Sequence, residues 1–392
     1  MTATPTHAPK TAVANRLFFV FGGPKFDLDS FGSRFEKLSE RYQGVCVTGA
    51  QEASDKYYGR FRIVTVSWRD GRLFNIRLLH RCLLVALRER FQGRAPALVV
   101  TSDPLKSGLY GYLVARLTGA KLAPEVNGDY ARDANYRDTS QQADRKRRQV
   151  LRLAKFVITR ADGVRLLHSK QIDFVGDRIA GKVVRVVPEF VDVRPFRDLG
   201  EEKVVLFVGF PFFLKGVDLL IAAFKRIATK HPQWKLKILG WYPDPTTLFA
   251  HIDNHPQIFH HPPVKHGEMP AHIGRCAILV LPSRSEAMGR VLLEAAAAGK
   301  ARIGSNIGGI PTVIADGKDG LLFEPENVSQ LSKQLDRLMT DDALRGALGR
   351  AARARLLSEF TVDRYLERIG DFYAGVIAHD GARGIVAQGR NE

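Results

Sequence analysis

The chain has 392 residues, 45% of them hydrophobic, so it is a globular protein longer than one hydrophobic core usually supports, and two domains are expected. Its net charge of +18 is uneven, because residues 1–200 carry a balance of +15 and residues 201–392 only +3. The three cysteines lie far apart with no C-x-x-C pair, which argues against a disulfide framework or a zinc site and fits a reducing cytoplasm. No apolar run is long enough for a signal peptide or a membrane span.

Short β-branched or aromatic runs alternate with longer helical patterns in the first half, which is typical of βαβ units and a parallel sheet. The expected strands are Leu17–Phe21, Val45–Thr48, Arg62–Val66, Ala97–Thr101, Lys121–Val126 and Val183–Val187. The expected helices are Gly32–Tyr42, Leu73–Phe91, Ser107–Thr118 and Gln141–Thr159.

Two of these helical patterns are strongly basic. Residues 73–94 place leucines at helical spacing among arginines such as Arg77 and Arg81, and residues 144–155 include Arg145 and Lys146. A basic amphipathic helix can lie on an anionic membrane surface, although a solvated face of an ordinary αβ helix is the other interpretation. The charge alone would also suit nucleic acid, but no RRM, zinc-finger or helix-turn-helix pattern is present, so no nucleic-acid partner is expected.

The alternation restarts after Leu199. Its expected strands are Val204–Val208, Lys235–Leu239, Ile278–Leu281 and Ala301–Gly304, with a helix at Gly216–Thr229 and a last helix at Val362–Ile377. Residues 188–200 form the expected linker. Two such domains facing each other would bind ligands at the carboxyl ends of their strands.

Residues 282–299 are the most informative stretch. Glu286 lies in a polar loop after the apolar run Cys276–Leu281, and Glu294 lies eight positions later in an Ala/Leu-rich helical run that begins near Gly289. A strand, a turn of small residues and a helix present free backbone N–H groups to an anion. A carboxylate further along that helix suits a sugar hydroxyl, so the pattern describes a nucleotide-sugar site.

This stretch resembles the E-x7-E motif of family 4 glycosyltransferases, which are retaining enzymes of the GT-B fold. The flanks agree, since Gly299 ends the helix and is followed by Ile303-Gly304-Ser305, Gly308-Gly309-Ile310-Pro311 and Gly320-Leu321-Leu322-Phe323. The resemblance runs from about Val204 to Asn327, and more loosely over most of the chain.

The resemblance implies an α/β protein of the GT-B fold, with two Rossmann-like domains facing each other across a cleft. The acceptor-binding domain would comprise residues 1–198 and the nucleotide-sugar-binding domain residues 199–358. A helix at 359–378 would cross back to the first domain, and residues 379–392 would form a disordered tail.

The resemblance also implies roles at the donor site. Glu286 would accept hydrogen bonds from the donor sugar, Glu294 from the ribose diol, and Lys215 would pair with the diphosphate. The other expected donor contacts are Gly209, Gly216, Met288, Gly289, Arg290 and, at the base, the backbone near Val264. Backbone contacts leave no side-chain code for the base, so a UDP-sugar and a GDP-sugar both stay open.

The chain departs from the family pattern at two positions. The family's Gly-Arg is Gly209-Phe210 here, so Arg284 or Arg290 is expected to supply the missing cation beside Lys215. In residues 125–129 the family has Glu-Val-His-Gly-Asp, but this chain has Asn127 at the His position, and an amide cannot act as a base. Asn127 and Asp129 are the candidate catalytic residues of the first domain, and a helix cap or turn is the alternative role for Asp129.

Two further segments carry acidic residues. Asp27-Leu28-Asp29 has the form of a D-x-D metal clamp, but the resemblance implies a diphosphate held by cations and a helix end, so no metal and no cofactor are expected. Asp103 is expected to be a structural cap.

The sequence therefore predicts a retaining, metal-independent glycosyltransferase of the hexosyltransferase type. It would transfer a sugar from a nucleotide-sugar to a glycan or lipid-linked glycan, in the cytoplasm or peripherally at the inner membrane face. The alternative is a catalytically impaired GT-B protein that binds a nucleotide-sugar or a partner, and a third class is a basic nucleic-acid binder.

Overall fold

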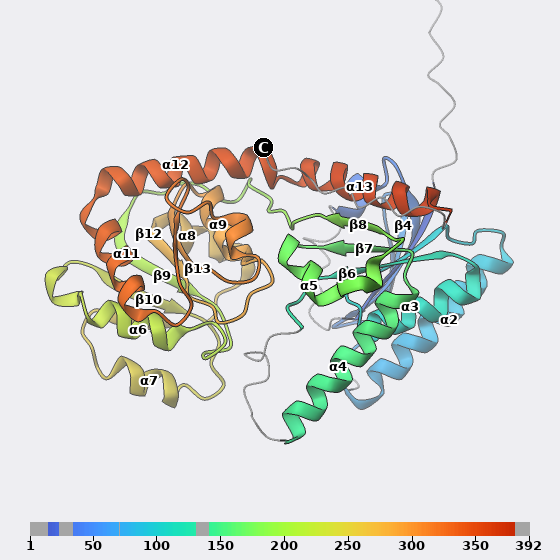
Figure 1. The fold of residues 1–392 in the computed structure, drawn as a ribbon, viewed down its shortest axis with the longest axis horizontal. Coiled ribbons are helices and arrows are strands. Elements are labelled where there is room, and N and C mark those ends of the chain that lie inside the picture. Colours follow the sequence, from blue (N-terminus) through green and yellow to red (C-terminus); the bar gives the residue numbers. More distant parts are fainter. Residues whose placement is uncertain (1–14, 23–33, 70, 131–140, 381–392) are drawn as a thin grey trace, which may run out of the picture.

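The structure is a computed structural model and describes residues 15–22, 34–69, 71–130 and 141–380. Two domains, each built on a parallel sheet, lie side by side, and two consecutive helices run along the same side of both (Figure 1). Residues 187–201 connect the domains without a strand or helix. No helix of the described residues is long and apolar enough to cross a membrane.

The first domain contains an eight-stranded sheet in the order β3-β4-β2-β1-β5-β6-β7-β8, parallel except for the pairing of β3 with β4. Its strands are β1 (Arg16–Phe21), β2 (Gln43–Ala50), β3 (Ser54–Tyr58), β4 (Phe61–Ser67), β5 (Leu98–Thr101), β6 (Lys121–Val126), β7 (Gly163–Leu166) and β8 (Val183–Val186).

The sequence missed β3 and β7. Strand β3 is a polar edge strand whose existence depends on its pairing with β4. Strand β7 is fully buried but contains Arg165, which interrupts the apolar run that would have revealed it.

Three helices lie side by side on one face of this sheet (Figure 1): α2 (Phe74–Phe91), α3 (Lys106–Thr118) and α4 (Gln141–Arg160). Three short helical segments follow β7: a 3₁₀ turn at Ser169–Gln171, α5 (Ile172–Val175) and a 3₁₀ turn at Gly176–Ile179. The opposite face packs against Phe35 and Leu38 of a helical segment at residues 34–38 and against the last helix, α13 (Val362–Ala378).

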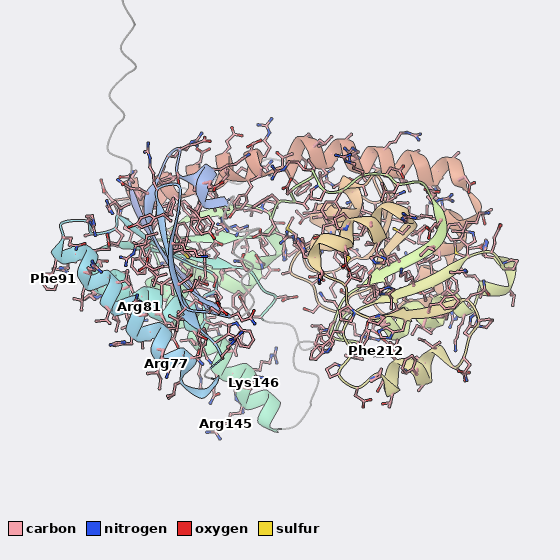
Figure 2. All side chains as sticks on the ribbon, turned by 180° about the vertical axis from the view of Figure 1, so that it is seen from behind. Arg77, Arg81, Phe91, Arg145, Lys146 and Phe212 are labelled. Carbon is pink, nitrogen blue, oxygen red and sulfur yellow. The ribbon has the colours of Figure 1, made fainter. Side chains whose placement is uncertain are left out.

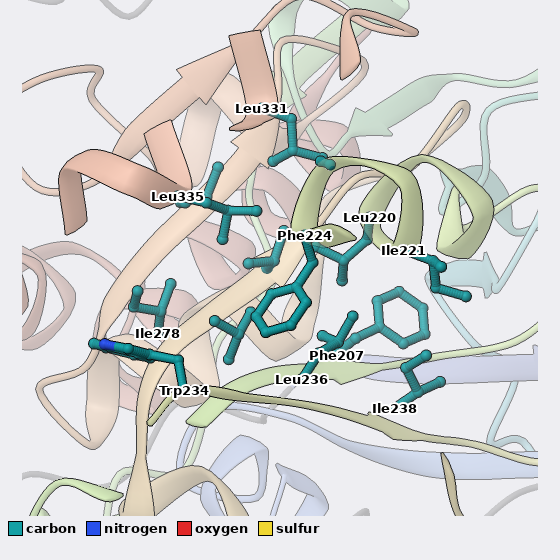
Figure 3. Close-up of a cluster of buried hydrophobic side chains, with 14 of the residues drawn as sticks. Phe207, Leu220, Ile221, Phe224, Trp234, Leu236, Ile238, Ile278, Leu331 and Leu335 are labelled. Carbon is teal, nitrogen blue, oxygen red and sulfur yellow. The ribbon is translucent and has the colours of Figure 1, made fainter. Parts of the chain in front are cut away.

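The second domain has six strands, all parallel, in the order β11-β10-β9-β12-β13-β14. They are β9 (Glu202–Val208), β10 (Lys235–Leu239), β11 (Ile258–His261), β12 (Cys276–Leu281), β13 (Ala301–Ser305) and β14 (Leu321–Phe323). The helices are α6 (Val217–Lys225), α7 (Thr246–Ile252), α8 (Met269–Arg275), α9 (Arg290–Ala297), α10 (Ile310–Val313), α11 (Val328–Thr340) and α12 (Asp342–Glu359). Phe207, Phe224 and Trp234 lie at the centre of one of its cores (Figure 3).

The last helix returns to the first domain through a buried polar network. The Tyr373 hydroxyl of α13 donates to Glu125 on β6 at 3.1 Å, and the same carboxylate accepts from Arg165 at 2.9 Å and lies 3.5 Å from Arg34. Burial would raise the pKa of Glu125, but Arg165 and Arg34 outweigh it and hold that pKa below its ordinary value. The carboxylate therefore stays charged, and it fixes α13 onto the first domain.

Candidate functional site

Two loops at the carboxyl ends of neighbouring strands form the centre of the site. The loop after β9 contains Lys215, and the loop after β12 contains Glu286. Their backbones are joined by a hydrogen bond from the Arg284 N–H to the Leu214 carbonyl at 2.9 Å. The Lys215 Nζ lies 2.6 Å from the Glu286 Oε2, and the Ser283 hydroxyl donates to the same oxygen at 3.3 Å. Two residues that are 71 positions apart thus form one ion pair.

Glycines allow these loops to approach each other. Gly216, the N-cap residue of α6, has a φ of +67°, and a Cβ on it would lie 2.0 Å from the Pro282 carbonyl oxygen. Gly289, the N-cap residue of α9, has a φ of +81°. Gly308 packs behind the loop after β12 that contains Glu286, which is called the acidic loop below. A Cβ on Gly308 would lie 1.9 Å from the Glu286 carbonyl oxygen. At each position a side chain would either strain the backbone or clash with a backbone atom.

Glu294 lies in the second turn of α9 and is only 8% exposed. Its burial raises the pKa of the carboxyl above the ordinary value, and nearby Arg290 and His266 offset only part of this effect. The Arg290 Nε lies 3.5 Å from the Glu294 Oε1, while most of the Arg290 side chain is exposed at the start of the helix. A buried carboxylate whose neighbourhood disfavours its charge is a feature of ligand sites.

Arg284 was one of the two expected substitutes for the missing arginine, and in the structure its guanidinium is occupied by protein partners. Its guanidinium donates to both oxygens of Asp218 at 2.7 Å, to Glu326 at 2.5 Å and 3.1 Å, and to the Phe213 carbonyl at 2.7 Å. All three nitrogens are therefore used to hold the loops together. Arg290 is left as the candidate cation beside Lys215.

Phe210 is 44% exposed and does not pack in the core. Its ring centroid lies 5.3 Å from that of Trp241, which is also exposed. The neighbouring Gly209 ends the strand, with its N–H donating to the Leu239 carbonyl and its own carbonyl accepting from the Tyr242 hydroxyl. The exposed Phe210 thus lies immediately after β9, where the family pattern has the arginine, and it contacts Trp241 from the loop after β10.

The remaining donor-side residues lie around the same loops. Val264, in the loop after β11, packs against the core cluster that includes the buried Met288. The Met288 Sδ accepts from the Glu189 N–H at 3.1 Å, so this position connects the acidic loop to the linker.

Asn127 is held inside the first domain. Its Nδ2 donates to the Ser102 carbonyl at 3.0 Å and to Glu125 at 3.3 Å, and its Oδ1 accepts from Arg165 at 3.2 Å. Every polar atom of the amide has a partner in its own domain. This arrangement gives Asn127 a structural role in the first domain, and its catalytic role stays a prediction.

Asp129 reaches the second domain, because its Oδ2 accepts from the Ser285 hydroxyl at 3.2 Å. A cavity of about 260 Å³ lies beside this contact. It is lined by residues 128–130 after β6, by His168, Lys170 and Gln171 after β7, and by Gly308 of the second domain. The structure thus brings Asp129 of the first domain and Gly308, which packs against the Glu286 backbone, to one cavity between the domains.

The sequence did not identify His168, Lys170 or Gln171. Gln171 joins the ends of two strands, since its Nε2 donates to the Val126 and Gly128 carbonyls. A signal existed, because polar residues directly after a buried parallel strand lie at the ligand edge of a sheet. It was missed together with β7.

Asp103 binds the turn before α3, where its carboxylate accepts from the Leu105 N–H at 2.8 Å and from the Ser107 hydroxyl at 2.7 Å. It is not the N-cap of the helix, because that position is Leu105 and has no side-chain cap hydrogen bond. Asp27 and Asp29 lie outside the described residues. Within the described residues, no three His, Cys, Asp or Glu side chains gather closely enough to hold a metal ion.

Comparison with known proteins agrees with this geometry. Residues 193–355, which include most of the second domain, match the family model described as glycosyl transferases group 1. Glycogen synthase of Mycobacterium tuberculosis is 35% identical over 171 residues, which are 40% of this chain and 38% of that protein. D-inositol 3-phosphate glycosyltransferase of an Arthrobacter species is 33% identical over 155 residues, 38% of this chain and 37% of that one. The chain thus spans about two fifths of the length of these curated relatives.

Solved structures resemble the whole chain. Sucrose-phosphate synthase from Thermosynechococcus elongatus superposes with a TM-score of 0.75 at 18% identity and covers 93% of this chain and 99% of its own. Anabaena Alr3699/HepE in complex with UDP-glucose gives a TM-score of 0.69 at 16% identity, covering 92% and 99%. The fold is therefore GT-B, as the sequence predicted, including the helix that crosses back to the first domain.

Proposed function

We propose that this protein is a retaining glycosyltransferase that transfers a sugar from a nucleoside-diphosphate sugar to a glycan or lipid-linked glycan acceptor. One observation carries the proposal: Lys215 and Glu286 form a 2.6 Å ion pair at the strand ends of the second domain, and the buried Glu294 follows Glu286 by eight residues. The site thus contains a cation for a diphosphate, then a carboxylate that can accept hydrogen bonds from a sugar, then a carboxylate that can accept them from a ribose.

The spacing along α9 suits a nucleoside diphosphate. Glu294 lies five residues after Gly289, or about 7–8 Å along the helix axis, which matches the separation of a diphosphate from a ribose diol. The diphosphate would sit at the start of α9, where backbone N–H groups and the helix dipole favour an anion. Lys215 and Arg290 would supply the neutralising charge without a metal ion.

The acceptor would bind in the cavity beside Asp129. His168 and Lys170 line this cavity and carry hydrogen-bonding groups, which suits a hydroxyl-rich ligand. Asp129 would align the attacking hydroxyl, and the leaving diphosphate would accept its proton on the same face of the sugar, which retains the anomeric configuration.

The rival is a GT-B protein that binds a nucleotide-sugar or a partner without efficient transfer. Two observations favour it: the Asn127 amide is occupied within the first domain, and Phe210 stands where the family has a diphosphate-binding arginine. Binding and turnover must therefore be measured separately.

Calorimetry with UDP, GDP and ADP tests the donor site, and we expect one of them to bind with a Kd that Lys215→Ala weakens. Release of the free nucleotide from the matching nucleotide-sugar, with the anomeric configuration of the product read by NMR, then tests transfer. Addition of a chelator should leave the rate unchanged. Binding without turnover over a panel of glycan acceptors would favour the rival, and binding of none of the nucleotides would overturn both.

A further inference from the structure

The solvent face of α2 has an unusual composition. Nine residues from Leu73, at the end of the preceding 3₁₀ turn, to Phe91 are exposed, and none is acidic. Four are large and apolar, with exposures of 50%, 65%, 45% and 83% for Leu73, Ile76, Leu84 and Phe91. The other five are Arg77, His80, Arg81, Arg88 and Arg90. The one acid in this stretch, Glu89, is buried and paired with arginines.

Other helices of the same protein show what an ordinary solvated face looks like here. The exposed residues of α11 are Ser329, Lys333, Arg337 and Thr340, with no large apolar side chain. The exposed face of α13 alternates acidic and basic residues. Single exposed apolar residues are normal on a protein surface, but several on one helix face among cations indicate an interaction site.

Helix α4 extends this surface. Among residues 145–160 the exposed side chains are six basic and two uncharged polar residues: Arg145, Lys146, Arg148, Gln149, Arg152, Lys155, Thr159 and Arg160. Figure 2 shows Arg145 and Lys146 at the start of α4 and Arg77 and Arg81 along α2, with Phe91 at the far end of α2. The exposed residues of α2 and α4 together are called the α2–α4 surface below.

A cavity of about 600 Å³ opens between α2 and the β3–β4 edge. Arg77, His80 and Arg81 line it together with the apolar Leu84. Its one acidic residue, Asp55, is held by two hydrogen bonds from Arg62, at 2.8 Å and 2.6 Å. A cationic cavity with an apolar wall matches the chemistry of a phosphate headgroup whose acyl chains continue along the protein.

We propose that the α2–α4 surface docks the protein on an anionic lipid bilayer. The cations match negative headgroups, and the apolar residues of α2 can enter the boundary between headgroups and acyl chains. Nucleic acid fits less well, because contacts with a phosphate backbone use cations and leave aliphatic side chains exposed to water.

Docking through this surface would also favour one kind of acceptor, an inference that rests on the proposed function. Helix α2 follows β4 and α4 follows β6, so both helices begin at the carboxyl edge of the parallel sheet. That is the edge where Asp129 meets the second domain. The acceptor side of the site would then lie near the membrane, which favours a lipid-linked acceptor over a soluble one.

The test is sedimentation of the full chain with vesicles of phosphatidylcholine alone or mixed with phosphatidylglycerol, in the absence of nucleotide. We expect binding to the mixed vesicles only, weakening as salt is added. Arg77→Glu/Arg81→Glu should reduce binding by about thirtyfold or more, because each basic residue near an anionic surface contributes about fivefold. Ile76→Ser/Phe91→Ser should reduce it by about tenfold through lost apolar burial.

The matched control is Lys333→Glu/Arg337→Glu, which makes the same charge change one helical turn apart on α11 and should bind vesicles like the parent. Equal losses in the control and in Arg77→Glu/Arg81→Glu would overturn the proposal, and so would equal binding to neutral vesicles. Tight duplex DNA binding that Ile76→Ser/Phe91→Ser does not change, without vesicle binding, would assign the surface to nucleic acid. Nucleotide calorimetry on each variant checks folding and keeps this outcome separate from the donor-site proposal.

Discussion

The Lys215–Glu286 ion pair makes a counterintuitive prediction for Glu286→Gln. The two side chains are 21% and 13% exposed and 2.6 Å apart, so a diphosphate must compete with the carboxylate for the lysine. Hydrogen bonds that involve a charged group contribute about 1.5–3 kcal/mol, and glutamine keeps the shape while it loses the charge. Removing this competitor should raise the affinity for a nucleoside diphosphate by up to about tenfold.

The same substitution should act in the opposite direction on catalysis. If Glu286 holds the donor sugar, its loss should lower turnover with the nucleotide-sugar by about a hundredfold, which corresponds to one charged hydrogen bond. Lys215→Ala should instead weaken binding of the bare diphosphate by about tenfold to a hundredfold.

Calorimetry with the nucleoside diphosphate compares the parent, Glu286→Gln, Lys215→Ala and Lys318→Ala. Lys318 is an exposed lysine of the same domain, and its removal should leave the affinity unchanged. The reasoning is refuted if Glu286→Gln weakens the diphosphate as much as Lys215→Ala does, because Glu286 would then belong to the diphosphate subsite. Parent-like affinity in Lys215→Ala would remove the lysine from the donor site altogether.

Three further substitutions test other parts of the site. Burial raises the pKa of Glu294, so its charged form destabilises the folded state at neutral pH, and this cost disappears below about pH 4. Glu294→Gln should therefore raise the melting temperature at neutral pH but weaken nucleotide binding by about tenfold to a hundredfold. Unchanged nucleotide affinity would contradict the role of Glu294 at the ribose. Gly308→Ala and Gly317→Ala both place a side chain at positive φ, which costs about 1 kcal/mol each, but only the Cβ at position 308 would clash with a backbone atom. Gly308→Ala should therefore lower the free energy of unfolding by about 2 kcal/mol more than Gly317→Ala does in denaturant titrations. Equal losses would show that the loop containing Glu286 can shift without cost. Because Phe210 is exposed, Phe210→Arg should fold normally and strengthen diphosphate binding by about tenfold, and an unchanged Kd would mean that the position does not face the diphosphate.

Much of the architecture was predictable because its signals are local. Strand β12 is buried along its whole length, so Cys276–Leu281 is apolar throughout and its strand state was evident. Strand β3 gave no such signal, because a polar edge strand exists only through its partner β4. Strand β7 was hidden because Arg165 is buried among apolar residues, and an arginine is buried only where distant acceptors such as Glu125 are present.

The donor motif shows the same division. Glycine at positions 216 and 289 and carboxylates at 286 and 294 are properties of short segments, and the sequence placed them around one expected ligand. Whether an arginine in that region is available to a ligand is a different question, which depends on residues far away in the chain.

By itself, the sequence determined the parallel sheets and the loops that carry the donor motif, since periodicity and turn chemistry act over a few residues. The return of the last helix to the first domain was implied by the family resemblance. The tertiary structure alone decided that Arg284 is bound by Asp218, 66 positions away, and that the Asn127 amide is held by Arg165 from the neighbouring strand. Side-chain charges and amides are directed by whichever partners the fold brings within hydrogen-bonding distance, and no local pattern records those partners.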